Sequence, residues 1–176
     1  VTGVQTCALP ICAYENWEVI ELALESLSAI EPDFILDISH MGFIGGLLDN
    51  MCIDHSVREQ LLVCIGSRNL HDLRAICKRN ELSGNSFRKL EEMVMIEGTP
   101  LQMLEKAEKL VENESMDAAL KELKRLMETA SLHPLSKQIH INFSIVNPID
   151  YYNGIVFQGF TSRLPQNVLF GGRYDH

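Results

Sequence analysis

The chain has 176 residues, of which 46% are hydrophobic and 22% are charged, so it is long and apolar enough to bury a globular core. The formal net charge of −9 argues against a nucleic-acid surface spread over the whole chain. No apolar run approaches the roughly 18 residues of a membrane span, and the start lacks the pattern of a secretory signal. The five cysteines have no disulfide-framework spacing, which favours a reducing cytoplasm.

The opening segment, VTGVQTCALPIC, has neither helical nor strand periodicity and resembles translated sequencing-adapter read-through. A natural loop is the alternative. We interpret residues 1–12 as a non-native segment and residues 13–176 as part of a longer protein, so that the chain is a fragment.

An amphipathic helix and a half-buried strand come next. Apolar residues at helical spacing define one face of the helix, namely Trp17, Ile20, Leu24, Leu27 and Ile30. Apolar and polar residues then alternate over 34–41, which predicts a strand with one buried face. Glycines at positions 42, 45 and 46 are expected to end this strand. His40 is interpreted as a local hydrogen-bonding residue rather than a catalytic base.

Residues 47–130 have an almost entirely helical pattern and are predicted to form a helical insertion between strands. Expected caps are Ser56 with Glu59, Ser67, and Thr99 with Gln102. The last helix has an apolar stripe of Met116, Leu120, Leu123, Met127 and Ala130. The segment KELKR at 121–125 is interpreted as a solvated helix face.

The remainder of the chain has a strand pattern. Residues 137–146 alternate, Asn147-Pro148 interrupts them, and 151–160 form the next expected strand. Residues 163–167 are expected to be a loop before a short strand over 168–172. Sequential strands with short links favour antiparallel pairing. The predicted class is α+β, with an antiparallel sheet and flanking helices.

Two motifs near the end combine residues suited to a small zwitterionic ligand. A tyrosine joins an apolar ring to a polar tip, glycines permit close backbone approach, and an arginine fork binds a carboxylate. An aspartate can bind an ammonium group or hold a tyrosine hydroxyl. The candidate residues are Asp150, Tyr151, Tyr152, Gly154, Gly171, Gly172 and Arg173. A buried hairpin without a ligand is the alternative, and Arg173 could bind the ligand or pair with Asp175.

These motifs, DYYNGIVFQGF and FGGRYD, resemble the histidine-pocket signature of the histidyl-tRNA synthetase family. The earlier DISHMGFIGGLLDN resembles the strand and helix that lead into that family's helical insertion. The resemblance implies a class II aminoacyl-tRNA synthetase core and a histidine-binding role for the seven candidate residues. Cys52, His55 and Cys64 have no common zinc-site spacing, so no metal or other cofactor is expected.

Departures from the family pattern affect the activation chemistry. Asn147 stands where the synthetases have an arginine, and Pro148 replaces the glycine after it. A neutral asparagine cannot supply a charged, forked donor to a carboxylate and an α-phosphate. Gln158 and Phe170 also depart from the pattern. We therefore expect a pocket that binds histidine without catalytic residues.

This combination resembles the family of ATP phosphoribosyltransferase regulatory subunits, which are synthetase paralogues without aminoacylation. The resemblance implies a hetero-oligomer with the short-form catalytic subunit, feedback by L-histidine, and no nucleic-acid or membrane partner. Two alternatives stay open: a fragment of a true histidine-tRNA ligase, and a structural paralogue without a ligand. An upstream ATP-binding motif and a C-terminal anticodon-binding domain would indicate the ligase.

Overall fold

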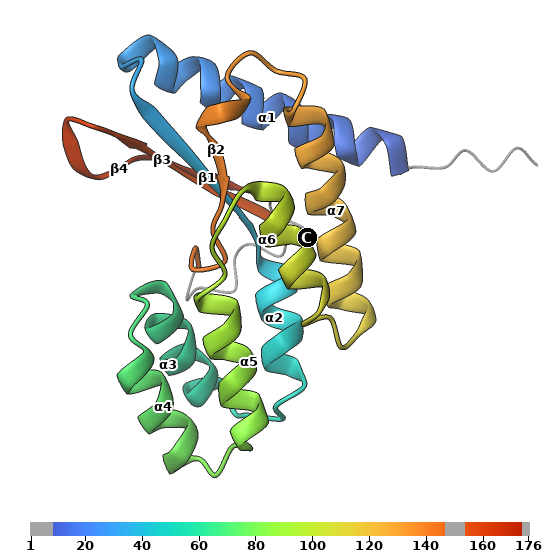
Figure 1. The fold of residues 1–176 in the computed structure, drawn as a ribbon, viewed down its shortest axis with the longest axis vertical. Coiled ribbons are helices and arrows are strands. Elements are labelled where there is room, and N and C mark those ends of the chain that lie inside the picture. Colours follow the sequence, from blue (N-terminus) through green and yellow to red (C-terminus); the bar gives the residue numbers. More distant parts are fainter. Residues whose placement is uncertain (1–8, 147–153, 174–176) are drawn as a thin grey trace, which may run out of the picture.

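The computed structural model describes residues 9–146 and 154–173, with side chains from residue 16 onward except at 165. The sheet lies toward one end of the molecule and a group of helices lies at the other (Figure 1). The elements are α1 (Leu9–Ile30), β1 (Phe34–His40), α2 (Met41–Asp49), α3 (His55–Gly66), α4 (Leu70–Arg79), α5 (Gly84–Val94), α6 (Pro100–Glu108), α7 (Glu114–Ala130), the 3₁₀ helix η1 (Ser136–Gln138), β2 (Ile139–Ile141), β3 (Ile155–Thr161) and β4 (Leu164–Gly172).

The described strands form one mixed sheet in the order β2-β1-β3-β4. Strand β1 pairs antiparallel with β3, from Phe34 opposite Thr161 to His40 opposite Ile155. Strands β3 and β4 form an antiparallel hairpin. The predicted α+β class is confirmed, and antiparallel pairing holds for these three strands.

Strand β2 was expected to pair with its neighbour in sequence, and that expectation is wrong. It lies on the other side of β1 and runs parallel to it, with Leu36 opposite Ile139. Parallel strands need a long crossover connection. The helices between β1 and β2 supply that crossover, so the insertion itself allows the parallel pair.

One sheet face is covered by helices in the described part of the chain. Leu36, Ile38 and Phe157 lie on this face and are buried. Helix α1 packs there, because a Cβ on Gly159 would lie 2.7 Å from a methyl of Leu27. The opposite face is more open, since Ile35 and Phe170 are each 41% exposed.

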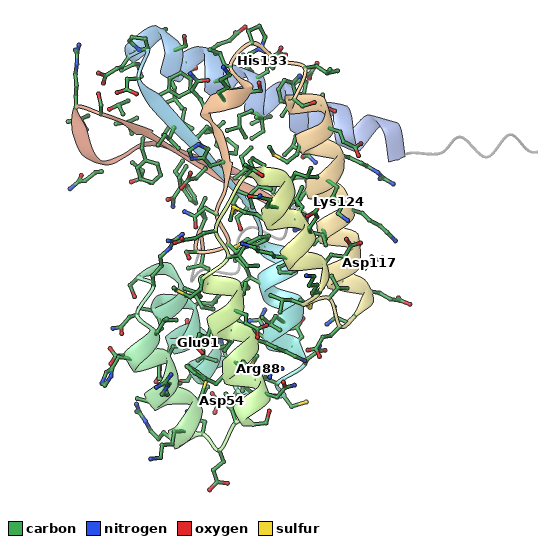
Figure 2. All side chains as sticks on the ribbon, in the orientation of Figure 1. Asp54, Arg88, Glu91, Asp117, Lys124 and His133 are labelled. Atoms are coloured by element: carbon green, nitrogen blue, oxygen red, sulfur yellow. The ribbon has the colours of Figure 1, made fainter. Side chains whose placement is uncertain are left out.

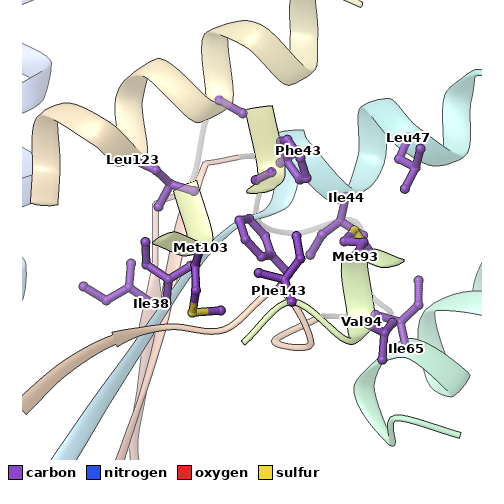
Figure 3. Packing of buried hydrophobic residues seen from close by; sticks show 14 of the residues in the cluster. Ile38, Phe43, Ile44, Leu47, Ile65, Met93, Val94, Met103, Leu123 and Phe143 are labelled. Carbon is purple, nitrogen blue, oxygen red and sulfur yellow. The ribbon is translucent and has the colours of Figure 1, made fainter. Parts of the chain in front are cut away.

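The apolar core runs from this covered face into the helical region (Figure 3). The rings of Phe43 and Phe143 lie 5.0 Å apart and join α2 to the segment after β2. Leu123 of α7 and Met103 of α6 pack beside Ile38 of β1 in the same view. Helices α3, α4 and α5 lie farther from the sheet (Figure 1). The helical insertion and the sheet therefore share one core.

Helix α2 begins where the sequence predicted only a strand break. It contains all three glycines at positions 42, 45 and 46. Glycine weakens an isolated helix by about 1 kcal/mol per residue. Here the packing outweighs that cost, because a Cβ on Gly46 would lie 2.7 Å from Cγ of Met116. The missing side chain lets α2 and α7 approach closely.

Several helix starts differ from the sequence prediction by a few residues. Asp54, rather than Ser56, caps α3 by accepting from the Val57 N–H at 2.8 Å. Asn69, rather than Ser67, caps α4. The capping box of Thr99 and Gln102 is confirmed. Aspartate, asparagine and serine are similarly good caps, so composition alone does not choose between close candidates.

The observed bounds of other elements also differ from the predicted ones. Helix α1 begins at Leu9, inside the segment that the sequence analysis separated, and Ile30 at its end is 64% exposed rather than buried. Strand β2 stops at Ile141, and the predicted alternation of burial ends with it, because Phe143, Ser144 and Ile145 are all buried. Strand β4 includes most of the expected loop, leaving only 162–163 between it and β3.

We predict that Gly46→Ala lowers the free energy of unfolding by about 1–3 kcal/mol, because the added methyl overpacks the contact with α7. Gly45→Ala is the matched control on the same helix, since its Cβ would meet only the tip of Arg58, at 3.2 Å. That control should change stability by less than about 1 kcal/mol. Urea denaturation of both variants measures the difference. Equal stability of the Gly46 variant and the parent would contradict the close approach.

Candidate functional site

A partly buried polar cluster lies where the sheet meets α7, with the carboxylate of Glu122 at its centre. The imidazole Nε2 of His40 lies 2.9 Å from one carboxylate oxygen. The other oxygen accepts from the side chains of Asn16 and Arg173. Helix α1, the end of β1, the residue after β4 and the middle of α7 thus meet at one carboxylate.

His40 is held in a single orientation by the start of α2. It is the N-cap residue of that helix, and its Nδ1 accepts from the Gly42 N–H at 3.0 Å. A neutral ring whose Nδ1 accepts carries its proton on Nε2. The Nε2–H therefore donates to Glu122. The prediction that His40 makes local hydrogen bonds is confirmed, while its contact with α7 was not foreseen.

The surroundings of Glu122 keep it ionised. Burial alone would raise its pKa, but the hydrogen bond from His40, together with the charge and hydrogen bond of Arg173, outweighs burial and lowers the pKa to about 2. A partly buried carboxylate is stable only when its oxygens accept several hydrogen bonds. This one accepts from three side chains on separate elements.

Gly154 and Arg173 lie beside each other at the same end of the β3–β4 hairpin. The Arg173 N–H donates to the Ile155 carbonyl at 2.8 Å, and the Gly154 carbonyl accepts from the Met41 N–H at 2.9 Å. A Cβ on Gly154 would lie 2.7 Å from Nε of Arg173. A larger residue at 154 would force the guanidinium group to shift, so these two predicted site residues are in direct contact.

The two glycines at the end of β4 occupy different environments. A Cβ on Gly171 would overlap the ring of Phe157, so this glycine makes room for a side chain of the neighbouring strand. Gly172 lies opposite Val156, on the other face of the sheet. The sequence analysis assigned both glycines to ligand approach, and packing within the sheet accounts for Gly171.

The remaining predicted site residues, Asp150, Tyr151 and Tyr152, lie outside the described residues, as do Asn147 and Asp175. Their described neighbours place the two motifs together. Strand β3 begins and β4 ends at one end of the sheet, because the strands run antiparallel with Val156 opposite Gly172. The two halves of the signature therefore leave the sheet from adjacent strands.

Sequence analysis missed Glu122 and Asn16. The interpretation of KELKR as a solvated face is wrong for Glu122, whose side chain is only 25% exposed. A usable signal was present, because Glu122 lies three residues after buried Ala119 and four before buried Leu126. A charged residue at such a core-facing helical position indicates a partner on another element.

A second polar cluster ties the helical region to the open side of the sheet. Arg68 donates to the Ser144 hydroxyl at 3.1 Å and to the Asn142 side-chain oxygen at 3.3 Å. The Asn142 amide in turn donates to Asp37 of β1 at 2.8 Å. Its donors and acceptors satisfy one another, so this cluster supports the structure after β2.

Comparison with known proteins adds a family context. The family model described as histidyl-tRNA synthetase matches residues 13–176. The ATP phosphoribosyltransferase regulatory subunit of Oceanobacillus iheyensis is 30% identical over 160 residues, covering 90% of this chain and 40% of that protein. The chain thus spans about two fifths of this curated relative's length. No helix in the described part of the chain is long and apolar enough to cross a membrane.

Solved structures share the fold. The crystal structure of an ATP phosphoribosyltransferase regulatory subunit/histidyl-tRNA synthetase from Bacillus halodurans C matches with a TM-score of 0.83 and 27% identity, covering 93% of this chain and 43% of that one. A chain of the ATP phosphoribosyl transferase (HisG:HisZ) complex from Thermotoga maritima matches with a TM-score of 0.69 and 19% identity, covering 92% of this chain and 56% of that one. The second likeness shows the fold alone.

We predict that Glu122→Gln lowers stability at neutral pH and that this loss shrinks as the pH falls. The folded-state pKa of Glu122, about 2, is below its ordinary value. Its stabilising effect is therefore complete above about pH 5 and is lost as the pH falls toward about 2. Urea denaturation of parent and variant at several pH values measures the difference between their unfolding free energies. A difference that stays constant with pH would contradict the buried ion-pair assignment.

Proposed function

Because the chain belongs to the histidyl-tRNA synthetase family, we propose that the whole protein is the non-catalytic regulatory subunit of ATP phosphoribosyltransferase, in the first step of histidine biosynthesis. The observation that carries this proposal is the relative of that name, which is 30% identical over 90% of this chain. In this role the protein binds L-histidine for feedback and activates the short catalytic subunit.

The ends of β3 and β4 support a ligand pocket at this position. Tyr151 and Tyr152 lie shortly before Gly154 in the first motif, and Arg173 follows Gly172 in the second motif. Gly154 and Arg173 are in contact, so the two motifs lie close together at this end of the sheet. Tyrosine rings and hydroxyls anchored there suit an imidazole ring with a polar tail. The assignment of the seven candidate residues to histidine binding is part of this proposal.

The charge balance favours binding over activation. Asn147 supplies no positive charge where the synthetase pattern has an arginine. Arg173 is already paired with the ionised Glu122. Stabilising a developing negative charge at a carboxylate and phosphate requires preorganised charged donors. A pocket of this composition suits recognition of histidine without formation of an adenylate.

The expected partner is the short-form catalytic subunit, in a hetero-oligomer. The solved complex from Thermotoga maritima contains a chain of the same fold, which supports this arrangement. We assign the assembly to the cytoplasm. Cys52, Cys64 and Cys77 are free thiols, as suits a reducing compartment.

A histidine-tRNA ligase is the second candidate. It is favoured by the description of the matching family and by the double name of the Bacillus halodurans structure. Asn147 and Pro148 argue against it, because the activating arginine is absent from the motif. The two candidates differ in whether the full-length protein forms a histidyl-adenylate.

We predict that the full-length protein forms a complex with a short-form ATP phosphoribosyltransferase and raises its activity. Co-purification and phosphoribosyl transfer assays with and without the protein test both parts. Histidine-dependent pyrophosphate exchange with ATP is the matched assay for the ligase, and we expect none. No complex and no rate change would count against the regulatory role, while robust exchange would favour the ligase.

We also predict that L-histidine binds the full-length protein and that Tyr152→Phe weakens this binding more than Tyr151→Phe. The sequence predicts a strand over 151–160, in which adjacent residues would point to opposite faces. We therefore expect one tyrosine to face the ligand, and the family pattern assigns that contact to Tyr152. Loss of a buried hydroxyl contact costs about 0.5–1.5 kcal/mol, or roughly two- to tenfold in affinity.

Calorimetry on both tyrosine variants measures the affinities, and circular dichroism checks their folding. If both variants bind histidine like the parent, or the parent does not bind, the pocket assignment is wrong.

A further inference from the structure

We propose that Glu122 of α7 is a positioning residue for the ligand pocket, acting through Arg173 to fix the ends of β3 and β4. This inference rests on the proposed histidine-binding function for its consequence, but its structural step can be tested separately. Glu122 lies in the helical insertion, far in sequence from both pocket motifs, and neither motif predicts its involvement.

The first step is the contact between Arg173 and Glu122. The Nη1 of Arg173 donates to the Glu122 carboxylate, and the Arg173 side chain is 31% exposed. A guanidinium on a flexible stem keeps one orientation when a carboxylate of fixed position accepts from it. Glu122 is itself fixed, because Asn16 and the N-cap residue His40 donate to the same carboxylate.

The second step is the close fit between Arg173 and β3. The guanidinium lies against the backbone of Gly154, where a Cβ would be 2.9 Å from its Cζ atom. The Arg173 N–H also bonds to the Ile155 carbonyl. Arg173 therefore contacts β3 and the residue before it through both its side chain and its backbone, and these contacts hold the end of β4 against the start of β3. Both pocket motifs continue directly from these two points.

The third step concerns the first strand. The Gly154 carbonyl accepts from the Met41 N–H, next to His40. His40 contacts Glu122 through its side chain. The carboxylate therefore joins β1, β3 and β4 at one end of the sheet. Loss of its charge leaves Arg173 beside Gly154 without this compensating anion, and the strand ends lose a common anchor.

The test uses the full-length protein with Glu122→Gln, and with Asp117→Asn as the matched control. Asp117 lies on the same helix (Figure 2) and makes an exposed ion pair with Lys121 at 2.5 Å. Calorimetry should show histidine affinity reduced about tenfold by Glu122→Gln, as expected when a charge-assisted contact that positions a pocket is removed. The control should bind within about twofold of the parent.

A double-mutant cycle separates positioning from general loss of stability. In an Arg173→Met background, Glu122→Gln should cause no further loss of histidine affinity, because the group through which it acts is gone. If the double variant instead loses histidine affinity by the product of the two single-variant factors, the two residues act independently and the proposal is wrong. If Glu122→Gln fails to fold, Glu122→Asp replaces it, since it keeps the charge but withdraws the carboxylate. Parent-like histidine affinity in a folded Glu122 variant would also overturn the proposal.

Hydrogen exchange distinguishes failure of this inference from failure of the proposed function. The amide hydrogens of Arg173 and Met41 should exchange about tenfold faster in the Glu122 variant than in the parent. Their exchange rates in the Asp117 control should equal those of the parent. If the parent binds no histidine but these amides respond, the positioning role stands and the ligand assignment falls. If the amides do not respond, the positioning role is wrong whatever the parent binds.

Discussion

The carboxylate of Glu122 is the constraint on which the arrangement at the ends of β1, β3 and β4 depends. A buried charge is costly unless it accepts enough hydrogen bonds. Three donors from α1, β1 and the end of β4 must therefore come together at α7. Their convergence explains why His40 caps α2 with one nitrogen and contacts α7 with the other. It also accounts for glycine at 154, where Arg173 passes close to the backbone.

The helical insertion is part of the same structure as the sheet. It provides the crossover that makes β2 parallel to β1, and its last helix supplies Glu122. Arg68 gives a second connection through Asn142 to Asp37, on the other side of β1. Leu123, next to Glu122, packs in the shared apolar core with Phe43. A displacement of α7 would therefore disturb both the core and the polar cluster at the strand ends.

Local signals made much of the fold predictable from the sequence. Alternation predicted β1, helical spacing predicted the buried faces of α1 and α7, and the capping box at Thr99 was found. The pairing of β2 was not predictable in this way, because it depends on a crossover rather than on chain proximity. Glycine-rich α2 was not predicted, because packing of α7 against Gly46 cannot be read from the local sequence. The site was partly predictable: the motifs contain Gly154 and Arg173, but Glu122, the partner of Arg173, belongs to a segment of α7 that was interpreted as a solvated face.

The same charge pairing bears on what kind of pocket the fold can support. In the part of the chain that the structure describes, the arginine of the second motif is compensated by a carboxylate of low pKa. The first motif has a neutral asparagine at its arginine position. An amino-acid ligand brings its own ammonium and carboxylate, which neutral hydrogen bonds and tyrosine hydroxyls can recognise. Adenylate formation adds negative charge that this arrangement does not offset. An arginine that holds strand ends together suits the proposed role of binding a ligand without activating it, and α7 joins those strand ends to the helical region.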